Sequence, residues 1–564
     1  MTLHIRWLGR VRYQDGLALQ RGLWRAGGEW LLLLEHDHVY TMGVRAKAEH
    51  VLVDPATVGA ELVRADRGGD VTYHGPGQLT GYPILSVPSG PDSVPAYVHG
   101  VEQVVIDALA DLGLQGAGRL ANYPGVWIED RKVCAVGVRV SRGRSMHGFA
   151  LNVNPDLGFF GHIIPCGIAG KQVTSLAAEG LDVSMHEVVD AISAHASQRW
   201  KNASSEAPPA DRQDVAWRVR PEDLSAFTQD GGTDDRGDQA VRPTAVPVRL
   251  LGRLAEAGVE ASQGLASSER KPPWLRAKAQ MGPEYRALKH TMRSLGLSTV
   301  CEEAGCPNIF ECWADGTATF MINGDRCTRA CGFCLVDTRK PDPLDAGEAD
   351  RVGEAVARMG LAYAVVTAVA RDDLADGGAA GFAATIRAVH RRCPGTSVEV
   401  LIPDCRGEPA ALRIIFDAHP EVLNHNIETV ARLQRAVRPS ASYARSLAVL
   451  ARAKAAGLTT KSGLILGMGE HEDEVLGALC DLHGVGCDIV TIGQYLRPTA
   501  RHLPVARWWT PEEFTRLKVL GEAMGIPHVE SSPLTRSSYH ARQAAQSVLA
   551  ASEGPQGTEA LSFA

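Results

Sequence analysis

The sequence predicts an α/β protein with two domains joined by a linker. Three observations support this prediction: 564 residues are too many for one ordinary domain, the composition changes after Trp200, and strand-like and helix-like segments alternate in the second half. A net charge of −7 without a basic stripe argues against a nucleic-acid partner. No apolar run could span a bilayer and no signal peptide is visible, so we expect a cytoplasmic protein without a membrane partner.

Composition divides the chain into four segments. Residues 1–200 and 268–550 are each long enough to form a domain with its own core. Residues 201–267 are rich in Ala, Pro, Gly, Ser and Asp and poor in aromatic residues, which predicts a flexible linker, with a short helix around Arg249 to Ala257. We expect residues 551–564 to be a disordered tail.

The second half has one repeating rhythm. Short apolar runs alternate with stretches of helical spacing, which predicts parallel strands connected by crossover helices. The single rhythm favours a partial (β/α) barrel over an open doubly wound sheet. The predicted strands are 317–324, 362–370, 397–404, 422–428, 459–468, 488–496 and 528–534.

The first half is predicted to be mixed α/β. Residues 30–36 and 79–87 have the composition of strands, and residues 97–113 have the spacing of an amphipathic helix. Residues 125–140 predict a hairpin with its turn at Glu129-Asp130.

Two cysteine triplets lie close together in the second half. Cys301, Cys306 and Cys312 have the spacing C-x4-C-x5-C, and the triplet 327/331/334 has the spacing C-x3-C-x2-C. Odd numbers of cysteines with no histidine between them favour iron–sulfur clusters over zinc, and zinc over disulfides. A 4Fe–4S cluster held by three cysteines keeps one iron open for a small molecule. The second triplet follows the first predicted strand, at the end of the barrel where such enzymes carry their chemistry.

These triplets and further motifs resemble lipoyl synthase, a radical S-adenosylmethionine (SAM) enzyme. The matching motifs are KPPWLR at 271–276, NHNIET at 424–429, KSGLILGMGE at 461–470, TIGQYLRPT at 491–499 and RSSYHA at 536–541. The resemblance implies a TIM-like partial barrel of the radical SAM type, and the insertion of two sulfurs at C6 and C8 of an octanoyl chain. It also implies an electron donor such as ferredoxin or flavodoxin.

The same resemblance implies two 4Fe–4S clusters and SAM as cofactors. One cluster, the radical SAM cluster, would be held by Cys327, Cys331 and Cys334. The other, auxiliary and sacrificial, would be held by the first triplet and Ser538, with Ser537 as the near alternative. The residues expected to contact SAM are Phe333, Gly377 and Gly378. The sequence departs from the family pattern at Ala368, Ala370 and Gly381, where a serine, an aspartate and a histidine are expected.

Three segments of the first half are candidates for chemistry: 67–79, 131–137 and 147–168. The glycine-rich first segment lacks the G-K-[ST] ending of a P-loop. Cys166 lies between a proline and a glycine, which favours an exposed thiol. A nearby cation would make that thiol a nucleophile, and Lys132 is a candidate for the cation.

These segments resemble octanoyltransferase, with a biotin/lipoate ligase-like fold, over roughly residues 30–180. The resemblance implies that Cys166 and Lys132 form a catalytic dyad. Octanoyl would pass from octanoyl-acyl carrier protein, through an acyl-cysteine, to a lysine on a lipoyl carrier domain of 2-oxoacid dehydrogenase or glycine cleavage proteins. Asp70 departs from the family pattern, in which glutamine is commoner. The implied substrate-lining residues are Arg67, Gly68, Gly69, Asp70, Val71, Thr72, Tyr73, His74, Ala135, Val136, Gly137, Gly148, Phe149 and Ala150.

Together the two resemblances imply a bifunctional enzyme of lipoate biosynthesis, a lipoyl(octanoyl) transferase fused to a lipoyl synthase. Alternatives remain open for each half. The first could be an ATP-dependent lipoate-protein ligase or a non-catalytic docking module. The second could be another sulfur-inserting radical SAM enzyme, such as a methylthiotransferase.

Overall fold

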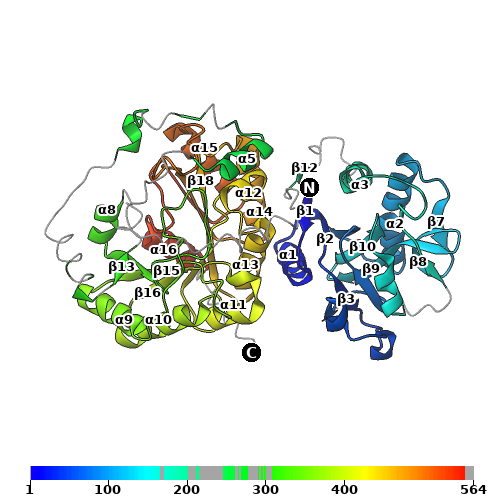
Figure 1. The fold of residues 1–564 in the computed structure, drawn as a ribbon, viewed down its shortest axis with the longest axis horizontal. Helices are drawn as coiled ribbons and strands as arrows, with labels where there is room; N and C mark the ends of the chain where they lie inside the picture. Colours follow the sequence, from blue (N-terminus) through cyan, green and yellow to red (C-terminus); the bar gives the residue numbers. More distant parts are fainter. Residues whose placement is uncertain are drawn as a thin grey trace, which may run out of the picture. The chain divides into compact units, whose positions relative to one another are not determined.

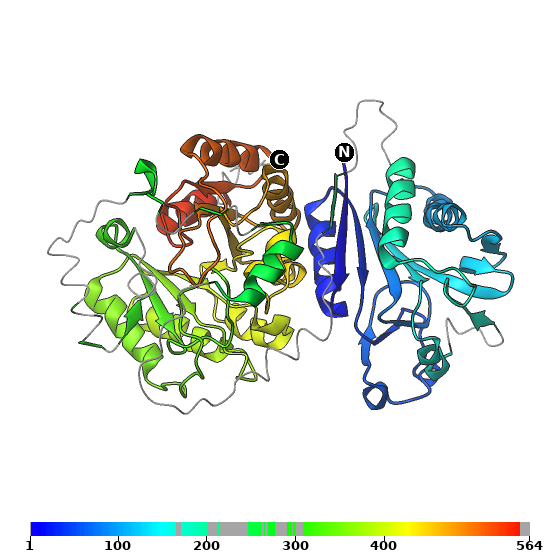
Figure 2. The ribbon, with the colours of Figure 1, turned by 45° about the horizontal axis from the view of Figure 1, so that its top comes forward.

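The chain divides into two compact units, residues 1–229 and 230–564 (Figures 1 and 2). The computed structural model describes residues 2–164, 171–200, 211–214, 246–260, 264–265, 269–276, 290, 292, 294–295, 297–299 and 308–552. The division at residue 229 falls within the predicted linker, whose bounds remain predictions. No helix in the described ranges is both long and apolar enough to cross a membrane.

Unit 1 is built on a nine-stranded sheet, counted over the described residues. Its main path runs in the order β12 (Asp211–Asp214), β1 (Leu3–Arg10), β2 (Glu29–Glu35), β6 (Gln78–Ile84), β10 (Arg144–Asn152), β9 (Arg131–Ser141), β8 (Tyr123–Ile128) and β7 (Ala117–Leu120), with β11 (Gln172–Val173) paired to β9. A smaller sheet has the order β4 (Glu61–Arg64), β3 (Val39–Met42) and β5 (Val71–His74). The predicted mixed α/β class is confirmed, and so is the hairpin turn, because Ile128 pairs with Arg131 across Glu129-Asp130.

Three helices in the described part of unit 1 cover this sheet. Figure 2 shows α1 (Tyr13–Ala26) on one face, and α2 (Ser93–Asp111) and α3 (Met185–Arg199) on the other. The buried side of α2 repeats at helical spacing, with Val101, Val104, Val105 and Ala108 in the core. A capping box fixes the start of α3: Ser184 accepts from the Glu187 N–H, and the Glu187 carboxylate accepts from the Ser184 N–H.

Unit 2 is a sheet of eight strands within the described residues, in consecutive order. β13 (Ser298–Thr299) is antiparallel to its neighbour, and the rest are parallel. The parallel strands are β14 (Thr317–Ile322), β15 (Tyr363–Ala368), β16 (Ser397–Leu401), β17 (Val422–Asn424), β18 (Thr459–Leu466), β19 (Ile489–Gln494) and β20 (His528–Ser531). All seven predicted strands are present, and the predicted partial barrel is confirmed.

Helices lie around the outside of these strands (Figure 1). The crossover helices are α9 (Glu348–Met359), α10 (Ala379–Arg392), α11 (Pro409–Phe416), α13 (Tyr443–Ala455), α14 (Glu472–Gly484) and α15 (Pro511–Ala523). Shorter or flanking helices are α5 (Val248–Glu256), α8 (Ile309–Ala314), α12 (Gln434–Val437) and α16 (Ala541–Ser552). α5 confirms the short helix expected near Arg249.

Two described elements lie wholly or partly within segments predicted as a linker and a tail. Residues Asp211–Asp214, inside the predicted linker, form β12 and pair in parallel with β1. Four polar residues can extend a sheet edge because the pairing uses backbone groups and needs no apolar side chains. α16 ends at Ser552, two residues into the predicted tail. The remaining tail residues, 553–564, lie outside the described residues.

A buried charged cluster occupies the interior of the barrel. The Lys461 ammonium on β18 lies 3.0 and 3.1 Å from the two Glu399 carboxylate oxygens on β16, and both side chains are 0% exposed. Tyr363 and Asn424 also donate to Glu399, from β15 and β17. Four adjacent strands therefore share one carboxylate.

Removing the cation from this cluster should destabilise unit 2. We expect Lys461→Met to lower its free energy of unfolding by about 3–5 kcal/mol, because the Glu399 charge stays buried without its main partner. Urea titration followed by circular dichroism measures the change. Arg358→Met, which breaks the exposed ion pair with Glu354, is the control and should cost at most about 1 kcal/mol. Equal effects of the two substitutions would contradict this account.

Candidate functional sites

The loop after β14 carries Cys327, Cys331 and Cys334, each half-buried. Backbone hydrogen bonds fold it: the Cys327 N–H donates to Asp337 O (2.8 Å), and the Cys334 N–H donates to Cys331 O (3.2 Å). Between them, Gly332 sits so close to Leu503 that a Cβ there would come within 2.9 Å of its side chain. Phe333, a predicted SAM contact, lies on this loop and is half-buried.

The electrostatics of this loop suit a cationic cluster. Burial raises the pKa of the Cys331 thiol, and burial raises the pKa of Cys334 to about 12. Negative charge on the neighbouring cysteines raises both pKa values further, whereas Arg438 lowers that of Cys331. Neighbouring thiolates of this kind need compensating positive charge, which the iron ions of a cluster supply. The donor set therefore fits a 4Fe–4S cluster held by three cysteines.

Gly377 and Gly378 precede α10, and the backbone explains why both are glycines. Their φ angles are +63° and +89°. A Cβ at Gly377 would lie 3.0 Å from Cys405 Cα, and one at Gly378 would lie 2.6 Å from Asn323 Nδ2. At Gly381, one of the departures from the family pattern, Asn323 Oδ1 would lie 2.2 Å from a Cβ. Asn323 occupies the space that a larger residue at Gly381 would need.

Of the residues predicted to hold the auxiliary cluster, the structure describes Cys312, on α8, and Ser538. Cys301 and Cys306 lie outside the described residues. Segment 534–543, which carries Ser538, packs on α8: Asn308 Nδ2 donates to Leu534 O (2.7 Å), and Tyr539 Oη donates to Glu311 (3.2 Å). Arg542 pairs with Asp315 over 2.8 Å. The structure therefore brings Cys312 and the RSSY segment (residues 536–539) onto the same face of α8.

The two serines of that segment differ in their partners. Ser537 Oγ accepts a hydrogen bond from Asn426 Nδ2 over 2.7 Å. Asn426 Nδ2 also donates to Glu428 over 3.1 Å. Ser537 therefore faces the ends of the barrel strands. Ser538 is half-buried.

In unit 1 the three segments predicted to line the substrate converge on one sheet region. On β10 and β9, Gly148 pairs with Gly137, and the pairs Phe149–Val136 and Ala150–Ala135 follow. The segment 67–74 joins them, because the Gly68 N–H donates to Val138 O over 3.0 Å. A Cβ on Gly137 would lie 3.1 Å from Gly68 O, so the glycines permit this close approach.

Polar side chains at both ends of the 67–74 segment are buried and hydrogen-bonded. Arg67 Nε donates to Thr41 Oγ1 (3.1 Å), and His74 Nδ1 bonds to Gln78 Oε1 (2.8 Å). Val71, Thr72 and Tyr73 are buried, and Tyr73 Oη bonds to His38 over 2.7 Å. Asp70 Oδ2 lies 2.7 Å from His50 Nδ1. Gly69 O would lie 2.5 Å from a Cβ on Gly43.

Lys132 lies on β9, and its side chain is buried. Its Nζ lies 4.6 Å from the centroid of the Trp127 ring, a cation–π geometry. Gly125 lies close to the same strand, since a Cβ there would come within 2.5 Å of Cys134 O. Cys166 lies outside the described residues, so the structure describes only one member of the predicted dyad.

Sequence reasoning missed two groups of residues near these sites. One is the set of ion pairs around Arg329, Asp372 and Asp404. The available signal was their position: Arg329 lies inside the C-x3-C spacing, Asp372 follows the predicted strand 362–370, and Asp404 is the last residue of the predicted strand 397–404. The other is the buried His36, whose Nε2 bonds to Tyr82 Oη over 2.7 Å. Its ring centroid lies 5.8 Å from that of His74.

Comparison with known protein families matches both units. The lipoyl protein ligase A/B catalytic domain matches residues 12–197, the N-terminal domain of lipoyl synthase matches 254–306, and the radical SAM superfamily matches 321–482. Lipoyl synthase of Kineococcus radiotolerans is 56% identical over 283 residues, which cover 50% of this chain and 85% of that protein. Lipoyl synthase of Mycobacterium tuberculosis is 59% identical over 273 residues, covering 48% of this chain and 88% of that protein.

One solved structure with a similar region is lipoate-protein ligase A bound with ATP, at 18% identity and a TM-score of 0.33, covering 40% of this chain and 92% of that one.

The family match to residues 321–482 shows that unit 2 carries the domain of a radical SAM enzyme. The chain belongs to the lipoyl synthase family, and a lipoyl protein ligase A/B catalytic domain precedes that part. Family membership implies SAM and two 4Fe–4S clusters as cofactors.

The stability of unit 1 should depend on pH through His36. Burial lowers the pKa of His36 from 6.5 to about 4. The unfolded chain therefore binds a proton first as the pH falls, and stability present above pH 6.5 is lost progressively toward pH 4. Between pH 7 and 5 we expect this histidine to remove about 2 kcal/mol of the free energy of unfolding.

The variant His36→Asn should reduce that slope by the same amount when urea unfolding of the full chain is measured at both pH values. An identical pH slope in the variant and the wild type would show that His36 does not titrate in this way.

Proposed function

We propose that this chain makes the lipoyl group in two steps on one carrier. Unit 1 transfers octanoyl from octanoyl-acyl carrier protein to a lysine of a lipoyl carrier domain, from 2-oxoacid dehydrogenase or glycine cleavage proteins. Unit 2 then inserts sulfur at C6 and C8 of that chain. One observation carries the proposal: a lipoyl protein ligase A/B catalytic domain and a lipoyl synthase share one polypeptide. Tethering raises the local concentration of the second site around the product of the first.

The surroundings of Lys132 support its role in the first step. The structure describes the chain up to Ile164 and again from Lys171. The Ile164 N–H donates to His50 O over 2.9 Å. Directly afterwards, Val173 pairs with Lys132, and the Thr174 N–H donates to Lys132 O over 2.9 Å. Val173, seven residues after Cys166, therefore lies beside the proposed cation on β9.

The proposed acyl transfer proceeds through Cys166. The Lys132 ammonium stabilises the Cys166 thiolate, which attacks the thioester carbonyl and releases the carrier-protein thiol. The amine of the acceptor lysine then attacks the acyl-cysteine, forms an amide and releases the Cys166 thiol. The converging segments 67–74, 135–137 and 148–150 would bind the chain, where each buried CH₂ contributes about 0.8 kcal/mol.

Cys166→Ala should abolish octanoyl transfer, by about 10⁴-fold or more, because the covalent route loses its nucleophile. Mass spectrometry of the carrier domain, with octanoyl-acyl carrier protein as donor and no ATP, measures the product. Sulfur insertion into a pre-octanoylated carrier should persist in the variant, because that step belongs to unit 2, and the circular dichroism spectrum of the chain should be that of the wild type. Cys134→Ala, a buried thiol on β9, is the matched control and should keep its transfer activity.

Two results would contradict the first step. One is unchanged transfer by Cys166→Ala. The other is transfer that requires ATP and free octanoate, which would assign unit 1 to the ligases.

The second step uses groups at the ends of the barrel strands. When bound, the radical SAM cluster supplies the electron that cleaves SAM, and the auxiliary cluster supplies the sulfur. Cys327, Cys331 and Cys334 would hold the first cluster. Cys301, Cys306, Cys312 and Ser538 would hold the second. The hydrogen bond from Asn426 to Ser537 supports Ser538 as the serine ligand, because it orients the Ser537 hydroxyl toward the barrel.

Substitution of the two serines separates their roles. Anaerobically reconstituted wild-type protein should carry about eight irons per chain, and Ser538→Ala should fall toward about four as the auxiliary cluster is lost. Ser537→Ala, the matched control, should keep about eight. Iron and acid-labile sulfide assays measure both, and SAM cleavage should survive in Ser538→Ala. Loss of iron in Ser537→Ala alone would reverse the assignment.

A further inference from the structure

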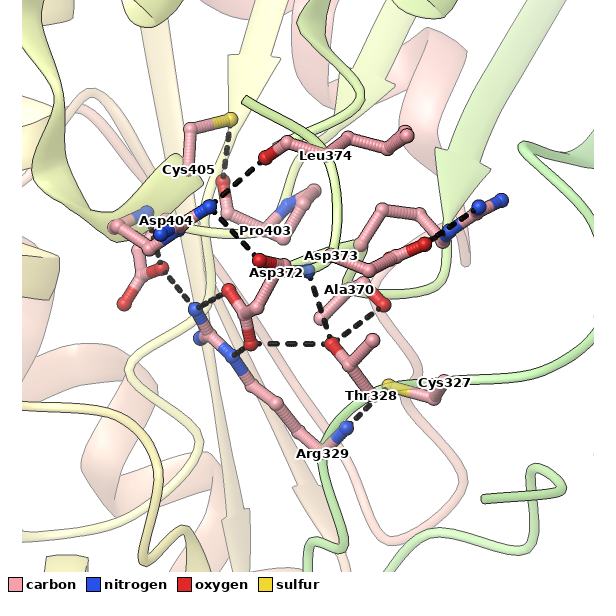
Figure 3. A network of polar contacts seen from close by, with 12 residues as sticks. Cys327, Thr328, Arg329, Ala370, Asp372, Asp373, Leu374, Pro403, Asp404 and Cys405 are labelled. Atoms are coloured by element: carbon pink, nitrogen blue, oxygen red, sulfur yellow. Dashed lines mark hydrogen bonds and ion pairs between the residues drawn. The ribbon is translucent and has the colours of Figure 1, made fainter. Parts of the chain in front are cut away.

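Ion pairs join three loops at the carboxyl ends of β14, β15 and β16 (Figure 3). The Arg329 guanidinium, on the cysteine loop, donates to both carboxylate oxygens of Asp372, each over 2.7 Å. It donates a further hydrogen bond to Asp404 over 2.6 Å. The Arg329 side chain is 7% exposed and that of Asp404 is 0% exposed, so water screens these charges little.

Backbone hydrogen bonds reinforce the link between the first two loops. The Thr328 N–H and hydroxyl both donate to Ala370 O, over 3.0 and 2.9 Å. The Asp372 N–H donates back to Thr328 Oγ1 over 3.0 Å. The Arg329 N–H lies 3.4 Å from the Cys327 sulfur, so the residue that forms the ion pairs also contacts a proposed cluster ligand.

The third loop supports the glycine segment Gly377–Gly378. Arg406 donates to Asp372 O and Leu374 O, over 2.8 and 2.9 Å. Asp404 Oδ1 accepts from the Arg406 N–H over 3.0 Å, and it holds a turn in which Cys405 and Arg406 have φ angles of +45° and +54°. Residues other than glycine rarely adopt positive φ angles, so the contacts around Cys405 and Arg406 must impose them. Gly377 lies directly against this turn.

We propose that Arg329 is a positioning residue that holds the cysteine loop in register with Gly377–Gly378, so that SAM binds weakly without it. The proposal deepens the lipoyl synthase step and rests on the cluster and glycine roles proposed above. Buried ion pairs seldom stabilise a fold more than apolar residues would, but they select one geometry. The planar guanidinium suits this task because it bonds two carboxylates from two strand ends at once.

Arg329→Lys tests the proposal, because lysine keeps the charge but cannot reproduce the fork of hydrogen bonds. After anaerobic reconstitution, the full-length variant should retain about eight irons per chain. Its Kd for radiolabelled SAM, from equilibrium dialysis, should rise about tenfold, within the usual range for coupling between two sites. The electron paramagnetic resonance spectrum of the reduced cluster should also respond less to added SAM. Arg339→Lys is the control, since Arg339 is 75% exposed in its pair with Asp337 and its Kd should be that of the wild type.

Asp372→Asn is the second variant, because it leaves the ion pair between Arg329 and Asp404 in place. It should also load iron and bind SAM more weakly, and it decides the matter if Arg329→Lys does not fold. An unchanged Kd and an unchanged spectral response in iron-loaded Asp372→Asn would overturn the proposal. These assays need no octanoyl substrate, so their failure is distinguishable from failure of the proposed function, which appears in the mass of the carrier product.

Discussion

Parallel pairing from β14 to β20 sends the carboxyl ends of seven consecutive strands to one edge of the sheet. The functional loops of unit 2 depend on this constraint. The cysteine loop follows β14, the glycine segment follows β15, and the turn at Asp404 follows β16. Residues far apart in sequence thereby become neighbours at the ends of adjacent strands. The same edge receives the RSSY segment after β20, through the hydrogen bond from Asn426 to Ser537.

Both units bury titratable groups. In unit 1, burial lowers the pKa values of His36 and His74, and their ring nitrogens bond to Val11 O, Tyr82 and Gln78. In unit 2, burial lowers the pKa of His425 to about 4, and ionised pairs are buried as well. Burial alone would raise the pKa of Asp404, but Arg329 and Arg445 hold that pKa well below its usual range. The ion pairs of Arg329 with Asp372 and Asp404 link the loops at the ends of three strands.

Close backbone approach recurs at both sites. On β9 and β10, Gly137 and Gly148 let the 67–74 segment and β6 lie against the strands, because a Cβ at Gly148 would come within 2.2 Å of Gly81 O. Near the cysteine loop, Gly377 and Gly378 allow contact with Cys405 and Asn323. The close contacts at these positions require glycine for structural reasons, apart from any role of the residues in binding. A contact between backbones leaves less freedom than a contact between side chains, so the loops are positioned accurately.

Local patterns in the sequence determined much of this protein. Hydrophobic periodicity identified the seven strands of the barrel, the turn at Glu129-Asp130 located the hairpin, and cysteine spacing indicated the cluster chemistry, because each signal lies within a short window. β12 was missed because Asp211–Asp214 is polar and gains its place only by pairing with β1. Tertiary structure alone decided the partners of Arg329, which lie 43 and 75 residues away. The order and register of the strands bring those loops together, and no local window contains that information.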